Sequence, residues 1–103
     1  MKKRPKKKVY HVSYDLKGAT TPDYRPLWAA MERYESIRIV RSTYLVATDQ
    51  TAEQLYQSLR NYLGVGRIFI SEVTSNRQGF MSKKAWEWLK KMKPKQLQPA
   101  VKS

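Results

Sequence analysis

Residues 9–16 read Val-Tyr-His-Val-Ser-Tyr-Asp-Leu, and the rest of the chain is organised around this stretch. Its side chains alternate between two faces with the two-residue period of a β-strand. β-branched and aromatic residues fill it, as suits a pleated, half-buried surface. The better core set is Tyr10, Val12, Tyr14 and Leu16, and the opposite face carries Val9, His11, Ser13 and Asp15.

A helix is expected after the polar loop of residues 17–22. Asp23 is suited to cap its N-terminus, and Pro26 falls in the first turn, where a missing N–H is tolerated. Apolar residues then recur at helical spacing, which predicts one buried face. They are Tyr24, Leu27, Trp28, Met31 and Tyr34.

Residues 36–48 are the most strand-like part of the chain and are too long for one average strand. They predict two strands, 36–41 and 43–48, that meet at a turn or bulge near Arg41 and Ser42. Thr51 and Gln54 have the spacing of a capping box, and Gly64 is suited to close the helix that follows. The apolar positions of that helix are Ala52, Leu55, Tyr56, Leu59, Tyr62 and Leu63.

Residues 67–74 predict a fourth strand, and residues 82–93 predict a third helix that Ser82 caps and Pro94 ends. Ile68 and Ile70 share one face of the strand, while Phe69 and Val73 share the other. The apolar stripe of the helix is Ala85, Trp88, Leu89 and Met92.

The predicted order is therefore βαββαβ with an added C-terminal helix. This order predicts an α+β, ferredoxin-like fold, in which two helices cover one face of a four-stranded antiparallel sheet. We divide the chain into a flexible basic arm (1–8), a ferredoxin-like domain (9–75), a loop with a basic helix (76–93) and a disordered tail (94–103).

Two helices leave the second face of the sheet, with His11 and Asp15, without a cover. That face must be solvated, covered by the third helix or buried against a second subunit. A second copy stacked there as a homodimer brings the two Asp15 side chains towards each other across a two-fold axis.

The net charge of +13 is concentrated at the two ends of the chain. Such basic segments bind polyanions by releasing condensed counterions, which predicts DNA or RNA as a partner, although they can also serve only to keep a protein soluble. The candidate nucleic-acid-binding residues are Lys2, Lys3, Arg4, Lys6, Lys7, Lys8, Arg38, Arg41, Lys83, Lys84, Lys90 and Lys91. Trp86 lies off the apolar stripe, so it either stacks on a base or packs on the domain or a partner.

The chain contains no cysteine, which excludes disulfides and thiolate metal sites and favours a reducing, cytoplasmic compartment. No apolar run approaches the ~20 residues of a membrane span, so we expect no membrane partner.

Two motifs, Ser13-Tyr14-Asp15 at the end of the first strand and residues 42–46 (Ser-Thr-Tyr-Leu-Val), resemble those of the CRISPR-associated small adaptation nuclease family and its SinR-like and VapD-like relatives. The resemblance covers roughly residues 9–75 and is closest to the SinR-like branch. It implies a ferredoxin-like homodimer in which paired Asp15 residues hold a divalent metal, usually magnesium, for phosphodiester cleavage. The CRISPR members also serve as scaffolds that capture DNA, and the VapD-like branch cuts RNA as a toxin.

The chemistry of Asp15 leaves alternatives open. Magnesium prefers six oxygen ligands, so one carboxylate per chain needs a second subunit or a phosphate to complete a site for metal-assisted hydrolysis. Asp15 can instead cap the following turn. His11 is either a general base or a packed residue, and we expect His11, Ser13 and Asp15, as neighbours on one strand, to be too far apart for direct proton relay.

The sequence thus predicts a nucleic-acid-binding homodimer, and the resemblance implies that it is a magnesium-dependent endonuclease. The alternatives are a non-catalytic scaffold or adaptor for DNA or RNA, and a ribonuclease toxin.

Overall fold

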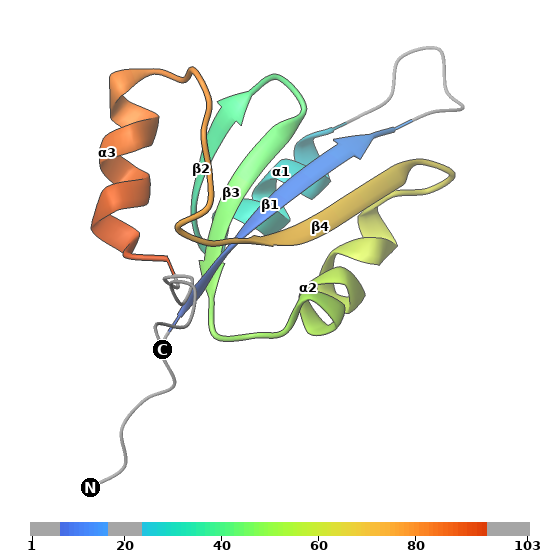
Figure 1. The fold of residues 1–103 in the computed structure, drawn as a ribbon. Coiled ribbons are helices and arrows are strands. Elements are labelled where there is room, and N and C mark those ends of the chain that lie inside the picture. The colour runs from blue at the N-terminus through green and yellow to red at the C-terminus, as the bar shows by residue number, and fades with distance from the viewer. Residues whose placement is uncertain (1–6, 17–23, 95–103) are drawn as a thin grey trace, which may run out of the picture.

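The computed structural model describes residues 7–16 and 24–94 of the chain (Figure 1). The predicted strands and helices are all present, with ends that differ by a few residues. In chain order they are β1 (Lys8–Asp15), α1 (Arg25–Glu32), β2 (Glu35–Val40), β3 (Thr43–Thr48), α2 (Ala52–Leu59), the 3-10 helix η1 (Arg60–Tyr62), β4 (Arg67–Val73) and α3 (Lys83–Met92).

The four strands form one antiparallel sheet in the order β2-β3-β1-β4. β1 is therefore a central strand, hydrogen-bonded on both sides. Ser13 in its middle faces Thr43 on β3 and Phe69 on β4. The pairing of β2 with β3 shifts register between Arg38 and Val40, close to the predicted irregularity.

Helices α1 and α2 cover one face of this sheet, and Tyr10, Val12 and Tyr14 of β1 point into the core between them. Leu27, Met31, Leu55 and Leu59 of the two helices are completely buried there. Each fully buried side chain of this kind contributes about 1.5–3 kcal/mol to stability, so this layer is the main core. The alternation read in residues 9–16 is confirmed.

Helix α3 lies against part of the other face (Figure 1). For this part, the expected cover by the third helix is confirmed over solvation or a second subunit. Leu89 is buried against Val9 of β1 and against Leu45 and Ala47 of β3. The side of the sheet that we expected to be open is thus covered by α3 at the Val9 end of β1.

Local signals in the sequence set most helix ends. Thr51 and Gln54 form both hydrogen bonds of the predicted capping box, and Gly64 adopts a left-handed conformation with φ 57°. Ser82 caps α3 by accepting a hydrogen bond from the Ala85 N–H at 3.1 Å. At α1 the predicted cap Asp23 lies outside the described residues, and Tyr24 occupies the N-cap position without a side-chain cap bond.

One expected core position is wrong. Tyr56 is 40% exposed, because only the side of α2 that carries Leu55 and Leu59 reaches the sheet. No helix in the described parts of the chain is long and apolar enough to cross a membrane.

Candidate nucleic-acid interface

Asp15 stands at the exposed end of β1, directly opposite Arg67 of β4. Both residues line an open hollow of about 380 Å³ beside Phe69, whose side chain is 65% exposed. Within residues 7–16 and 24–94 the single ion pair joins Lys7 to Glu35, so the Asp15 carboxylate is not paired with Arg67. Asp15 is therefore available to a ligand or a partner.

The backbone beside Asp15 is tightly fitted. A Cβ atom on Gly66 would lie 2.7 Å from the Asp15 carbonyl oxygen, so glycine is needed for the loop to pass this close to the end of β1. The close approach holds the backbone at the end of β1 against the loop that leads into β4.

A single chain offers few ligands for a metal ion near Asp15. No group of three or more His, Asp or Glu side chains that could hold a metal occurs among the described residues. Magnesium binds oxygen ligands and keeps several waters, so Asp15 fits such a site only when a second carboxylate or a phosphate joins it.

His11 lies closer to Ser13 than we expected. The Ser13 hydroxyl oxygen is 3.3 Å from Nε2 and 3.4 Å from Nδ1 of the imidazole, and 3.3 Å from the Thr43 hydroxyl oxygen. The Ser13 hydroxyl thus contacts both His11 on its own strand and Thr43, its partner across the sheet. His11 also lines a small cavity of about 140 Å³ with Trp86 and Leu89 of α3. The structure thus places His11 as a packed residue beneath α3.

The lysines of α3 face away from the sheet. Lys83, Lys84, Lys90 and Lys91 are exposed, while the Ala85 and Leu89 side of the helix is buried. At 3.6 residues per turn, Lys83 and Lys90 fall on one line along the helix and Lys84 and Lys91 on the next. The four lysines therefore form one surface, which we call the α3 lysine face.

Two other residues of α3, the aromatic Trp86 and the acidic Glu87, bear on what this face can bind. Trp86 is half-buried and packs against the cluster beneath α3, which favours the packing alternative over an exposed stacking residue. Glu87 is exposed and lies between the two lines of lysines, where it reduces the positive charge of the α3 lysine face.

The remaining predicted binding residues belong to other parts of the chain than α3. Lys2, Lys3, Arg4 and Lys6 are outside the described residues. Lys7 pairs with Glu35 at 3.2 Å, Lys8 begins β1, and Arg41 is exposed in the turn between β2 and β3.

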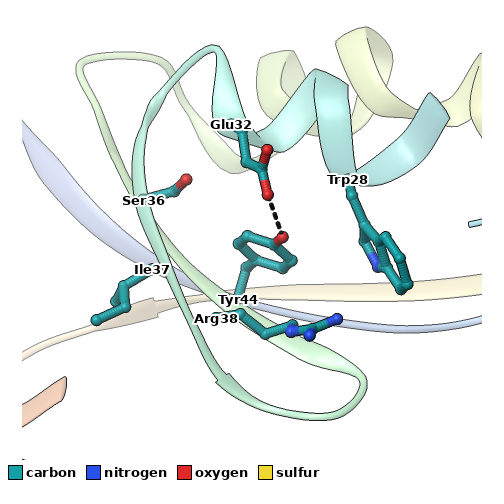
Figure 2. A pocket seen from close by; sticks show the side chains of 6 residues that line it. All are labelled: Trp28, Glu32, Ser36, Ile37, Arg38 and Tyr44. Carbon is teal, nitrogen blue, oxygen red and sulfur yellow. Dashed lines mark hydrogen bonds between the residues drawn. The ribbon is translucent and has the colours of Figure 1, made fainter. Parts of the chain in front are cut away.

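Arg38 belongs to a groove of about 400 Å³ between α1, β2 and β3 (Figure 2). Its guanidinium carbon lies 4.9 Å from the centroid of the Trp28 ring, in a cation–π contact. Figure 2 shows the Arg38 side chain running along the groove towards Trp28. Arg38 thus points to the helix-covered side of the sheet, away from Asp15 and α3.

Aromatic residues hold this groove in place. The Trp28 indole donates a hydrogen bond to the Tyr14 hydroxyl at 2.9 Å and stacks on Tyr24 with a centroid distance of 5.6 Å. On the other side, the Tyr44 hydroxyl donates to Oε2 of Glu32 at 2.9 Å (Figure 2). Burial, and then the adjacent Glu32 carboxylate, raise the pKa of Tyr44 to about 12, so Tyr44 remains a donor at physiological pH.

The groove is a feature that the sequence pattern does not predict. The sequence pattern predicts Trp28 only as a core residue and gives Glu32 and Tyr44 no place in a site, because the groove is made by three elements that periodicity treats separately. The position of Glu32 off the apolar face of α1, one helical turn after Trp28, was the available signal.

Comparison with known proteins found no matching family model, no matching curated protein and no matching solved structure.

Proposed function

We propose that this chain is a cytoplasmic nucleic-acid-binding protein that acts as a homodimer with a ferredoxin-like fold. The fold assignment is supported by the strand order β2-β3-β1-β4, with β1 and β3 at the centre and both α1 and α2 on one face.

The α3 lysine face carries the proposal. Four exposed lysines sit on a helix that is anchored by its buried side, so their backbone positions are fixed before any ligand binds. α3 has 10 residues and is about 15 Å long, and duplex DNA presents one phosphate charge per ~1.7 Å of its axis. A phosphate is therefore within reach of each lysine.

The part of the sheet that α3 leaves uncovered is the proposed dimer contact. Exposed Phe69 gives this surface an apolar side chain, and the neighbouring residues Asp15 and Arg67 give it charges of both signs. Such a patch is self-complementary across a two-fold axis. The change Phe69→Glu should convert the dimer to a monomer in sedimentation analysis, and a dimer that survives this change joins elsewhere.

The salt dependence of binding tests the role of α3. Each phosphate that is neutralised contributes about −0.9 to the slope of log K against log salt for duplex DNA. Replacing Lys83, Lys84, Lys90 and Lys91 by glutamine should make the slope shallower by up to about 3.6. Glu87→Gln should strengthen binding, because it removes the one negative charge on the same surface. An unchanged slope in the quadruple variant would refute the proposal.

A magnesium-dependent endonuclease is the second candidate, because the Asp15 carboxylate is exposed and unpaired on the proposed dimer contact. Wild-type protein and Asp15→Asn should be incubated with labelled DNA and RNA, first with magnesium and then with a chelator. Cleavage that needs both the metal and Asp15 supports the enzyme. Equal binding without cleavage supports the scaffold, and growth arrest on expression that Asp15→Asn relieves supports a ribonuclease toxin.

A further inference from the structure

We propose that the groove between α1 and β2 binds a guanine nucleotide, with its phosphate at Arg38 and the Watson–Crick edge of its base at Glu32. The inference deepens the proposed function and rests on it, because a nucleotide within a bound single strand and a free nucleotide present the same chemistry to this groove.

The phosphate end of the groove is formed by Arg38. Among the described residues no carboxylate lies within ion-pair distance of its guanidinium, although Glu32 lines the same groove. The Trp28 ring, itself held by Tyr24 and Tyr14, provides a fixed surface for the guanidinium. A planar guanidinium held in this way presents its N–H groups in the geometry that suits two phosphate oxygens.

The base end of the groove is formed by Glu32. The Tyr44 hydroxyl donates to Oε2 of the carboxylate, which leaves Oε1 and the second lone pair of Oε2 to accept from a ligand. Guanine carries two adjacent donors, N1–H and the 2-amino group, that can meet one carboxylate together. Adenine and cytosine offer one amino group and uracil one ring N–H, so they make fewer hydrogen bonds to Glu32.

The size and the walls of the groove fit the same ligand. Its volume of about 400 Å³ falls in the range of roughly 300–1,000 Å³ that is usual for small-molecule sites. Arg38 and Glu32 do not form an ion pair with each other, so they suit a ligand that has an anionic group at one end and hydrogen-bond donors at the other.

The test is a titration of the full-length ¹⁵N-labelled protein with guanosine monophosphate, followed through the indole N–H resonance of Trp28. Guanosine, which lacks the phosphate, and cytidine monophosphate are the comparison ligands. Arg38→Gln should weaken binding of guanosine monophosphate about tenfold or more, and Glu32→Gln should remove most of its advantage over cytidine monophosphate. Arg60→Gln and Glu53→Gln, which change exposed residues outside the groove, are the matched controls.

A short guanine-containing single strand is then titrated to separate this inference from the proposed function. A strand that binds through the α3 lysine face without moving the Trp28 resonance, together with no shift from the mononucleotide, overturns the groove and leaves the proposed function intact. A mononucleotide shift that Arg38→Gln weakens supports the groove even when the strand fails to bind. Equal binding of guanosine and guanosine monophosphate, or equal binding by wild type and Arg38→Gln, overturns the inference.

Discussion

Truncation of Leu89 to alanine should detach α3 from the sheet without unfolding the domain. Leu89 is 2% exposed and contacts Val9, Leu45 and Ala47 beneath the helix. The change removes three buried carbon atoms, worth about 0.8 kcal/mol each, and the remaining cavity adds to the loss. The docking of α3 should therefore weaken by about 3 kcal/mol.

The separation of the two apolar clusters makes this loss local. The main core lies between the sheet and the pair α1 and α2, and no residue of α3 belongs to it. Hydrogen exchange followed by NMR is the appropriate assay, because it reports local opening separately from global unfolding. Amide protection in α3 should fall about 100-fold in Leu89→Ala, while the most protected amides of β1 and β3 should change far less.

Two matched variants complete the experiment. Leu59→Ala truncates a leucine that is completely buried in the main core, so protection should fall throughout the domain. Lys84→Ala changes an exposed residue of α3 and should leave protection of β1 and β3 unchanged. If Leu89→Ala lowers protection in β1 and β3 as much as in α3, the helix is an integral part of one cooperative core and the reasoning fails.

Three further predictions follow from local structure. Ser82→Ala removes the cap of α3 and should destabilise that helix by about 1 kcal/mol, measured by its amide protection; full protection would contradict the capping role. The pKa of Tyr44 is about 12 in the folded protein and about 10 in the unfolded chain, so between these pH values the unfolded chain binds fewer protons. The free energy of unfolding should therefore fall as pH rises from 10 to 12. Tyr44→Phe should flatten this fall, as measured by denaturant titrations. In Gly66→Ala the new Cβ meets the Asp15 backbone, so the variant should destabilise the folded protein by roughly 1–3 kcal/mol and shift the Asp15 resonances. In Gly64→Ala the new Cβ has open space but the φ of 57° is strained, so this control should leave the Asp15 resonances in place.

Local patterns predicted the elements well because their causes are local. The alternation in residues 9–16, the Thr51–Gln54 capping box and the Gly64 cap depend on residues that are near one another in sequence, and all three are confirmed. Trp86 shows the limit of this approach. The angular position of Trp86 around α3 follows from 3.6 residues per turn. Whether that side of the helix faces solvent or the sheet depends on how α3 docks.

The amino-acid sequence by itself determined the order of strands and helices, the inward side of β1 and the concentration of positive charge at the ends of the chain, because period, capping and charge are properties of short segments. The tertiary structure alone decided that α3 covers part of the second sheet face. It also brought Arg38, Glu32 and Tyr44 into one groove. These residues come from three elements, and their meeting depends on packing between segments that no local pattern specifies.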